Sequence, residues 1–236
     1  MKIKIVKTQD LPVAIVDNFY TDLELKRIMN FCAMSNPYSW FRDPNKNGGA
    51  KDDNGKDKKN SYALCVDDWY TPVGRQFCDL FIVNRKLWDK KFTDKLEKSH
   101  KLFSTIKAVN RDTTFLNYYE DKNSYDFHTD TAVFTVLTFF FKRPKKFSGG
   151  ELLIDKDIKI DCENNRMVIF PSILDHKVET VNMKTKAKLH GRFSMTQFLN
   201  YRWQMIDPIT ALSAANLAFN GVKKAIQVGR DLEDIF

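Results

Sequence analysis

The sequence contains few cysteines, no long apolar run and no internal repeat. Its four Cys include no C-x-x-C pair, which excludes a dense disulfide framework and favours free thiols in a reducing compartment. The longest apolar stretch, 133–141, is interrupted by Thr and is too short to cross a bilayer. The N-terminal segment 1–7 lacks the continuous apolar core of a signal peptide. We therefore expect a soluble, cytoplasmic protein.

What is present is a globular composition with many aromatic rings. The 236 residues are 43% hydrophobic and include 19 Phe, which indicates one domain over residues 1–236 with a substantial core. The net charge of +8 permits binding to nucleic acid or to an acidic protein. However, Lys and Arg are scattered, and their denser runs at 85–101 and 142–146 are typical of solvated faces. A polyanion partner is therefore not the favoured interpretation.

The N-terminal part, to about residue 105, is expected to be mostly helical. Residues 12–19 have the pattern of a strand that leads into a helix, and Thr21 with Glu24 forms a capping box at the start of that helix. Residues 72–104 are predicted to be mainly helical, with a basic outer face. The apolar face of the first helix would consist of Leu23, Ile28, Phe31 and Cys32.

From Ile106 onward the pattern changes to short strands. Many short strands at close spacing favour an antiparallel barrel or sandwich, so a core over about 106–202 is predicted to be mainly β. Residues 207–236 are predicted to form one or two closing helices. The expected strands are 113–119, 126–129, 133–141, 151–154, 158–161, 166–171, 176–181 and 191–200.

A long polar loop interrupts the helical part. Residues 42–60 contain three Gly and many charges, with almost no apolar residues, which predicts a mobile loop. Such a loop is either a plain surface excursion or a lid over a substrate. The flanking aromatic residues modestly favour the lid; they are Trp40, Phe41, Tyr62, Trp69 and Tyr70.

The most informative motif is His128-Thr-Asp130. Residues i and i+2 of a strand face the same side, so this pair can offer an imidazole nitrogen and a carboxylate oxygen to one point. A second His from a distant strand would complete the two-His, one-carboxylate set that suits non-haem Fe(II). His176 is the preferred candidate because it begins a strand after a proline turn, and His100 and His190 are the alternatives.

An iron site with open positions needs electrons to activate oxygen, and a keto acid that chelates the iron can supply them. The far carboxylate of such an acid requires a cation that stays charged and binds in a bidentate manner, which Arg does better than Lys. Arg192 and Ser194 alternate on one strand face and could hold that carboxylate together. Lys186 and Lys188 are the competing cations.

Several segments around these residues follow a recognisable order. They are Tyr119, nine residues before His128, the stretches 147–154, 166–172 and 176–181, and Gly191-Arg-Phe-Ser194. Over about residues 12–200 the chain resembles the prolyl 4-hydroxylase-like branch of the Fe(II)/2-oxoglutarate-dependent dioxygenases. The resemblance implies a double-stranded β-helix, which is a cupin-like jelly-roll of two facing sheets, with supporting helices.

The resemblance also implies roles for the site residues. The H-x-D pair and His176 would bind Fe(II), while Arg192 and Ser194 would bind the distal carboxylate of 2-oxoglutarate. Tyr119 is the expected hydroxyl donor to this co-substrate, and Tyr118 is the alternative. Ascorbate is allowed as an auxiliary reductant.

The sequence departs from the family pattern at three places. Phe139 stands where a Tyr is often found, Lys122 stands where a Gly is expected, and the segment 182–190 is longer than usual. These departures affect the expected contacts to the co-substrate more than the expected metal site.

The resemblance implies hydroxylation of prolyl residues in a peptide or protein, with release of succinate and CO2. An extended substrate would lie across the barrel mouth under the loops 42–60 and 120–127, with Trp40, Trp69 and Tyr125 as proline-stacking groups. Oxidative demethylation of nucleic acid is a second hypothesis, although the segment after Arg192 lacks the further Arg of that branch. A non-catalytic jelly-roll binding module is the third.

Overall fold

The protein is described here from a computed structural model, which covers residues 1–8, 11–43, 49–69 and 78–201, without the side chain of Trp69. Residues Met1–Tyr201 form one compact unit. The helices expected over 207–236 lie outside the described residues.

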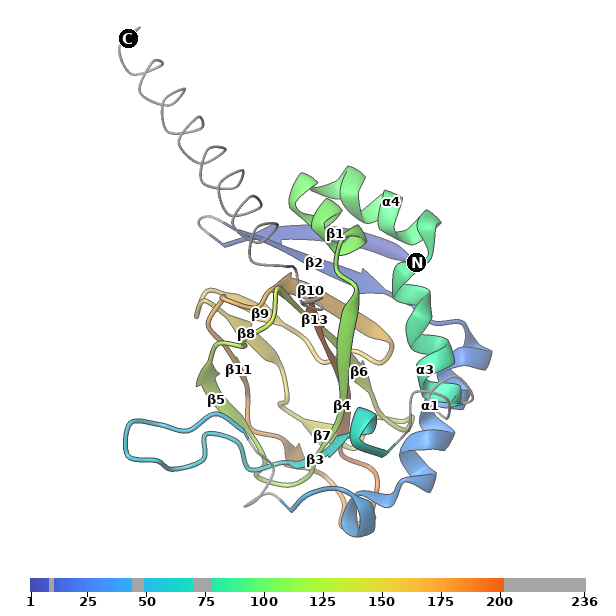
Figure 1. Ribbon diagram of the computed structural model, residues 1–236. Helices are drawn as coiled ribbons and strands as arrows, with labels where there is room; N and C mark the ends of the chain where they lie inside the picture. The colour runs from blue at the N-terminus through green and yellow to red at the C-terminus, as the bar shows by residue number, and fades with distance from the viewer. Residues whose placement is uncertain (9–10, 44–48, 70–77, 202–236) are drawn as a thin grey trace, which may run out of the picture. The chain divides into compact units, whose positions relative to one another are not determined.

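Two antiparallel sheets face each other (Figure 1). The large sheet has seven strands, in the order β1 (Lys2–Lys7), β2 (Pro12–Asp17), β10 (Arg166–Pro171), β6 (Phe134–Phe140), β13 (Arg192–Asn200), β4 (Arg111–Tyr119) and β3 (Tyr62–Cys65). The small sheet has four strands, in the order β5 (Tyr125–His128), β11 (His176–Val178), β8 (Leu152–Ile154) and β9 (Ile158–Ile160). A two-stranded ribbon pairs β12 (Asn182–Met183) with β7 (Phe147–Ser148). This arrangement confirms the prediction of a jelly-roll.

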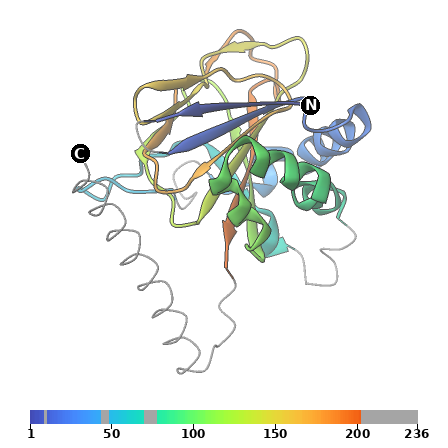
Figure 2. The ribbon, with the colours of Figure 1, turned by 90° about the horizontal axis from the view of Figure 1, so that it is seen from above.

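The helices cover the face of the large sheet that points away from the small sheet (Figures 1 and 2). The longest are α1 (Asp22–Met34) and α4 (Lys90–Ser99), and α3 (Asp79–Asn84) is shorter. Single turns and short helical segments complete the layer, namely η1 (Asn36–Trp40), η3 (Val66–Trp69), η4 (Arg85–Trp88) and η5 (Lys101–Lys107).

Strand β6 has apolar side chains on both faces because it lies between two separate cores. Val136 and Phe140 pack with the helices, whereas Leu137 and Phe139 pack in the space between the sheets. A strand buried on both faces needs no apolar–polar alternation, which explains the nearly continuous apolar run in the sequence. The helix layer therefore supports the same strands whose other face forms the interior of the jelly-roll.

The capping box at the start of α1 is present as predicted. The Glu24 backbone N–H donates to Thr21 Oγ1 at 3.3 Å, and the Thr21 N–H donates to the Glu24 carboxylate at 2.7 Å. The expected apolar face of this helix is wrong at one position, because Leu23 is 64% exposed. Leu23 lies in the first turn, beyond the edge of the buried stripe that contains Ile28 and Cys32.

The N-terminal part holds more strand than the sequence pattern indicates. In addition to β2, it supplies β1 and β3, which are the two edges of the large sheet. Strand β1 alternates exposed Lys with half-buried apolar residues. In the part of the chain that the structure describes, no helix combines the length and the apolarity needed to cross a membrane.

Candidate metal centre

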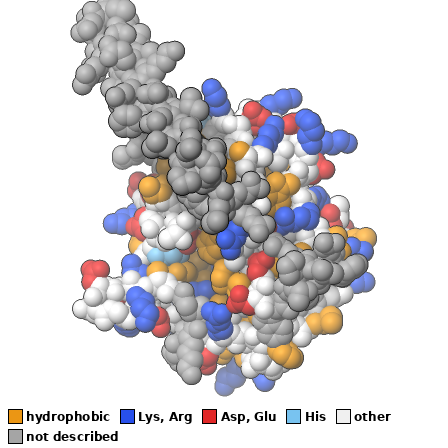
Figure 3. All heavy atoms as spheres, viewed as in Figure 1, with side chains coloured by type: hydrophobic (Ala, Val, Ile, Leu, Met, Phe, Trp, Pro, Cys, Tyr) orange, Lys and Arg blue, Asp and Glu red, His pale blue; other side chains and the backbone are white. Residues whose placement is uncertain are grey.

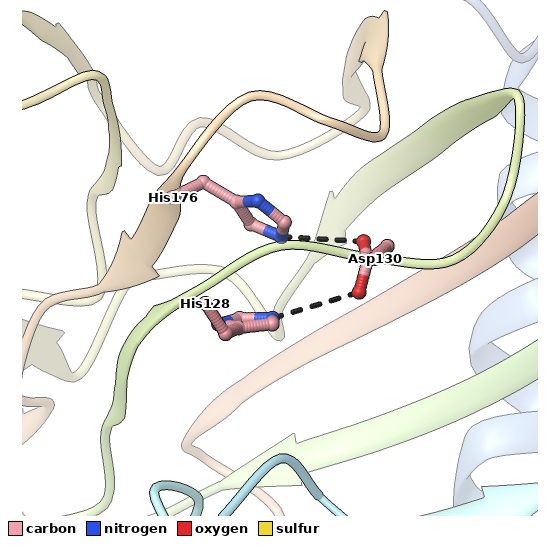
Figure 4. A group of neighbouring side chains, drawn as sticks. All are labelled: His128, Asp130 and His176. Atoms are coloured by element: carbon pink, nitrogen blue, oxygen red, sulfur yellow. Dashed lines mark ion pairs between the residues drawn. The ribbon is translucent and has the colours of Figure 1, made fainter. Parts of the chain in front are cut away.

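Three side chains converge at one point between the sheets (Figure 4). His128 ends β5, Asp130 follows two residues later, and His176 begins β11 directly opposite His128 in the antiparallel register. One ligand atom from each of the three lies within 4.8 Å of the others. The Asp130 carboxylate is 3.7 Å from His128 Nε2 and 3.3 Å from His176 Nε2.

Backbone carbonyls fix the orientation of both imidazole rings. His128 Nδ1 lies 2.8 Å from the carbonyl oxygen of Asp126, and His176 Nδ1 lies 2.9 Å from that of Leu174. A carbonyl only accepts hydrogen bonds, so each Nδ1 carries the proton and donates it. The lone pair of each Nε2 is then directed at the common point, which is the tautomer that a metal-binding His requires.

The Asp130 carboxylate is held by residues of β6 and of the turn after β10. Thr135 Oγ1 donates to Asp130 Oδ2 at 2.6 Å, and the same hydroxyl lies 2.9 Å from Ser172 Oγ. The backbone N–H of Asp130 donates to the Ser172 carbonyl at 2.9 Å. The Phe-Pro-Ser turn that precedes His176 in the sequence therefore also positions Asp130.

Burial and mutual proximity shift the titration of these groups. Burial, and after it the charge of the neighbouring His176, lower the pKa of His128 from its usual value of 6.5 to about 4. Burial alone would raise the pKa of Asp130, but the hydrogen bond and charge of His176 outweigh it, so this pKa is lowered. At neutral pH the site therefore offers a neutral imidazole and a carboxylate anion, which are the forms that bind a divalent metal.

A cavity of about 110 Å³ opens onto the three side chains. Tyr125 forms one wall, because its ring stacks on that of His128 with 3.6 Å between centroids. The Tyr125 hydroxyl accepts a hydrogen bond from the backbone N–H of Ala50 at 2.9 Å, which ties the loop before β3 to this wall. The remaining lining residues are Gly49, Lys59, Phe115, Asn117, Tyr119, Thr135, Leu137, Val178, Thr196 and Phe198.

The surface around the site shows no single charge sign. His atoms are visible among hydrophobic atoms on the face shown in Figure 3, and Lys and Arg are interspersed there with Asp and Glu.

Arg192 lies beside this cavity and is fully buried. Its Nε donates to the Gly150 carbonyl at 2.9 Å and its Nη1 to Ser194 Oγ at 3.2 Å, while its Nη2 has no hydrogen-bond partner within the described chain. The guanidinium lies over the rings of Tyr119 and Phe139, at 4.7 and 4.9 Å from their centroids. Neither Arg192 nor Ser194 lines the cavity, so Tyr119 connects the two regions.

Strand alternation separates the two adjacent tyrosines of β4. Tyr119 faces the space between the sheets, where burial raises the pKa of its hydroxyl and the nearby Arg192 opposes that rise. Tyr118 points to the helix layer, and its hydroxyl accepts a hydrogen bond from Gly191 N at 3.3 Å. Of the two candidates for contact with a co-substrate, the structure therefore places Tyr119 at the cavity.

Other predicted residues lie elsewhere. Trp40 is 54% exposed and does not line the cavity, and the side chain of Trp69 lies outside what the structure describes. His100 accepts a hydrogen bond from the Leu102 N–H at the start of η5, and Lys188 stacks on the ring of Tyr38 at 5.2 Å. Neither belongs to the group of ligand atoms around Asp130.

Asn117 and Lys59 are among the cavity residues that the sequence reasoning missed. Asn117 precedes Tyr119 by two positions, so strand alternation could have found it. Lys59 belongs to the polar loop 42–60, where several lysines occur close together and no sequence signal distinguishes one that points inward. Its burial lowers the pKa of its ammonium group to about 7, against the attraction of Asp130.

Comparison with known proteins agrees with this geometry. The sequence of residues 113–200, from within β4 to the end of β13, matches the 2OG-Fe(II) oxygenase superfamily. This segment is therefore similar to a 2OG-Fe(II) oxygenase domain. The matched segment includes every residue of the candidate metal centre as well as Arg192 and Ser194.

Part of the chain is also similar in sequence to a hydroxylase. A PKHD-type hydroxylase of Crocosphaera subtropica is 33% identical over 85 residues, which are 31% of this chain and 38% of that protein. The matched region is thus less than half of the relative's length. The superfamily name specifies the two cofactors, Fe(II) and 2-oxoglutarate, and the His-Asp-His cluster is a ligand set that suits the first of them.

Solved structures share the fold of this chain. A prolyl-4-hydroxylase of Pseudomonas putida has a TM-score of 0.51 at 11% identity, covering 80% of this chain and 92% of its own. The collagen prolyl hydroxylase of Paramecium Bursaria Chlorella virus-1, solved with 2OG, has a TM-score of 0.50 at 13% identity, covering 80% and 96%. At these identities the likeness shows the fold alone.

Proposed function

We propose that this chain is an Fe(II)- and 2-oxoglutarate-dependent hydroxylase that acts on prolyl residues of a peptide or protein. The observation that carries the proposal is the convergence of His128, Asp130 and His176 beside a buried Arg192 with an unpaired Nη2. The His-Asp-His cluster suits a divalent metal, and the Arg192 guanidinium suits a carboxylate anion.

In this proposal the two imidazoles and the carboxylate hold Fe(II). Both Nε2 lone pairs are directed at the same point by the backbone carbonyls behind the rings, so metal binding needs little reorientation. Thr135 keeps the carboxylate of Asp130 in place. Because the three ligands lie on one side, the opposite side of the metal would face the cavity.

Arg192 and Ser194 hold the distal carboxylate of 2-oxoglutarate in this proposal. A buried guanidinium N–H without a partner costs free energy, and a carboxylate oxygen would satisfy it. The Gly150 carbonyl and Ser194 fix the plane of the guanidinium before the co-substrate arrives. Tyr119 links the cavity to this subsite and is the proposed hydroxyl donor.

The cofactors supply the oxidation chemistry: oxygen is activated, 2-oxoglutarate becomes succinate and CO2, and one oxygen atom is added to the substrate. The protein's part is to orient the groups and exclude water. Leu137, Val178 and Phe198 give the cavity apolar walls, and the Tyr125 ring covers His128 on one side.

The prolyl substrate is supported by the kind of relatives that share the sequence and the fold. Their names describe a PKHD-type hydroxylase and prolyl hydroxylases, one of which is named a collagen prolyl hydroxylase. Tyr125 is the predicted stacking residue that lines the cavity, and it is the one we expect to contact a proline ring.

Anaerobic titration of the iron-loaded chain with 2-oxoglutarate tests the cofactor assignment. We expect the absorption band that arises when a keto acid chelates Fe(II), and we expect His176→Ala to abolish it. His100→Asn is the matched control, because His100 caps a helical segment away from the site and Asn keeps the capping function. Absence of the band in the unmodified chain would overturn the proposal.

Turnover tests the substrate assignment separately. The loaded chain is incubated in air with proline-rich peptides, and succinate and peptide mass are measured. A gain of one oxygen atom on proline, coupled to succinate release, is the expected result. A chain that shows the absorption band but oxidises no prolyl peptide retains the cofactor assignment and loses the substrate assignment.

A further inference from the structure

The turn directly after β10 places a second hydroxyl group behind the Asp130 carboxylate. Phe170 is the cross-strand partner of Thr135 on β6, and Ser172, two residues further along, faces the same side. Two backbone bonds fasten this turn to the segment before β6. Asp130 N donates to the Ser172 carbonyl at 2.9 Å, and Ser172 N donates to the Val133 carbonyl at 3.2 Å. The Ser172 side chain therefore has a fixed position beside Thr135.

The protons of the two hydroxyl groups are ordered by what the carboxylate can accept. A carboxylate that binds a metal is ionised and only accepts hydrogen bonds, so Thr135 uses its single hydroxyl proton for Asp130 Oδ2, at 2.6 Å. The contact of 2.9 Å between Thr135 Oγ1 and Ser172 Oγ then requires Ser172 to be the donor. The hydrogen bonds thus run from Ser172 through Thr135 to Asp130, and a hydroxyl that accepts one bond becomes a stronger donor in the next.

Both hydroxyl groups are buried in the interior of the jelly-roll. Thr135 is 1% exposed and Ser172 is fully buried, and the apolar side chains of Leu137 and Phe170 pack in the same interior. Burying a hydroxyl costs free energy that its hydrogen bonds must offset, so packing alone would be served better by apolar side chains of the same shape. The carboxylate explains the two hydroxyls, since its oxygens must stay turned toward both imidazole rings (Figure 4).

We propose that Ser172 is a positioning residue of the metal centre and that it acts through Thr135. Ser172 directs the Thr135 hydroxyl at Asp130, and this bond keeps the carboxylate turned toward the point that both Nε2 atoms face. The inference rests on the proposed function, because it requires that the centre holds a divalent metal. It assigns the Phe-Pro-Ser turn a side-chain role in addition to its backbone bond with Asp130.

The affinity for Zn(II), measured on the full chain by competition with a chromophoric chelator, tests this assignment without turnover. Thr135→Val keeps the shape of the side chain and removes the hydroxyl, so we expect the dissociation constant to rise about 10- to 100-fold, as for other groups that orient a metal ligand. Ser172→Ala should raise it about fivefold, which is the effect of one neutral hydrogen bond. Thr135→Ser restores the donor and should bind Zn(II) within about twofold of the unmodified chain.

The double variant decides whether Ser172 acts through Thr135. In the Thr135→Val background we expect Ser172→Ala to change the dissociation constant by less than about twofold, because the acceptor of the Ser172 proton is gone. Denaturant unfolding of each metal-free variant is recorded alongside, since a merely structural role would lower the free energy of unfolding without this pattern of affinities.

Thr138→Val is the matched control. Thr138 lies on the same strand as Thr135 but faces the helix layer, together with Val136 and Phe140. It is fully buried, and its Oγ1 has no hydrogen-bond partner within the described chain. The control variant should therefore bind Zn(II) as the unmodified chain does.

The outcomes separate this inference from the proposed function. If Thr135→Val binds Zn(II) as tightly as the unmodified chain, or if Ser172→Ala has no effect or the same effect in both backgrounds, the inference is overturned and the metal assignment stands. If the unmodified chain binds no Zn(II), or if Asp130→Asn binds it equally well, the metal assignment fails and the inference fails with it.

Discussion

At the scale of single residues, Arg192 shows how a binding group can be prepared in advance. Two of its three nitrogens are occupied by the Gly150 carbonyl and Ser194, and the rings of Tyr119 and Phe139 enclose the planar guanidinium. Phe139 stands where the family often has a Tyr, so its contribution is an apolar face and not a hydroxyl. The remaining N–H groups point in a fixed direction.

Arg192→Lys is expected to weaken 2-oxoglutarate binding by about 10- to 100-fold although the charge is kept, because Lys loses both the bidentate geometry and the anchoring bond to Gly150. The dissociation constant is measured from the anaerobic absorption titration. Arg166→Lys is the matched control, since Arg166 pairs with Asp17 on β2, with 2.6 Å between Nε and Oδ1. An equal loss in both variants would contradict a specific role for Arg192.

The buried His128 predicts that the metal-free protein loses stability in mild acid. Its pKa is about 4 in the folded chain and 6.5 when unperturbed, so the unfolded chain binds more protons between these values. The free energy of unfolding is therefore highest above pH 6.5, where His128 is neutral in both states. It falls as the pH falls toward 4, and the loss is on the order of 2 kcal/mol by about pH 4.5. The lowered pKa of Asp130 acts in the same direction.

Thermal unfolding of the chelator-treated protein between pH 7 and about pH 4.5 measures this effect. His128→Gln keeps a neutral polar side chain but cannot be protonated, so its melting temperature should fall less over the same interval. Parallel pH profiles for the two proteins would exclude His128 as the source of the acid sensitivity.

The residues of the metal centre were predictable because their spacing reflects strand geometry. His128 and Asp130 share a face by position alone, and the proline turn correctly indicated that His176 returns to the same region. Lys59 was not predictable, because its inward direction depends on pairing with Tyr125, a contact between distant parts of the chain. The choice between Tyr118 and Tyr119 likewise required knowledge of which face of β4 meets the helices.

At the scale of elements, the turn between β7 and β8 is fitted closely around Arg192. Gly150 has a φ of +75°, and a Cβ added there would lie 2.8 Å from Arg192 Cδ and 3.1 Å from Val181 Cγ2. Glycine is therefore required twice, once for the backbone conformation and once for the approach of the guanidinium. Strand and turn together place the carbonyl that orients Arg192.

Gly150→Ala is expected to destabilise the fold by about 2–4 kcal/mol and to weaken 2-oxoglutarate binding, because backbone strain and a clash with Arg192 combine. Gly55→Ala is the matched control: its φ is +78°, but nothing lies within 4 Å of the added Cβ. In Gly55→Ala, backbone strain alone should lower the free energy of unfolding by about 1 kcal/mol and leave 2-oxoglutarate binding unchanged. Denaturant unfolding and the absorption titration measure the two effects, and equal values for both variants would show that the clash is relieved elsewhere.

The order of the strands was largely predictable from the sequence for residues 111–200. It was less predictable for the part of the chain before residue 111. Most strands of 111–200 lie close to the expected boundaries, since they show an apolar pattern bounded by turn residues. Strand β11 ends at Val178 and not at 181, and the short strands β7 and β12 were not predicted. Strands β1 and β3 were not predicted. Strand β1 alternates Lys with apolar residues, and β3 is only four residues long, so each gives a weak signal. Their pairing is decided by neighbouring strands that are distant in sequence.

At the scale of the whole molecule, the folded unit is longer than the segment that matches the oxygenase superfamily. The matched segment 113–200 carries the metal centre and Arg192, but its large sheet is completed by β1, β2 and β3. The region before the match also supplies the helix layer and Lys59. The candidate metal centre and Arg192 thus lie in the matched segment, while the parts outside it support the sheet and shape the cavity.

Because the metal centre joins β5, β11 and the segment before β6, ligand binding should stabilise the whole folded unit. Saturating Zn(II), at about 100 times its dissociation constant, should add about 2.7 kcal/mol and raise the melting temperature by roughly 5–10 °C. 2-Oxoglutarate should add a further increase only when metal is present, since in the proposed site the metal would hold its keto-acid end. Asp130→Asn should remove most of both increments, and an equal response to 2-oxoglutarate with and without metal would contradict binding at this centre.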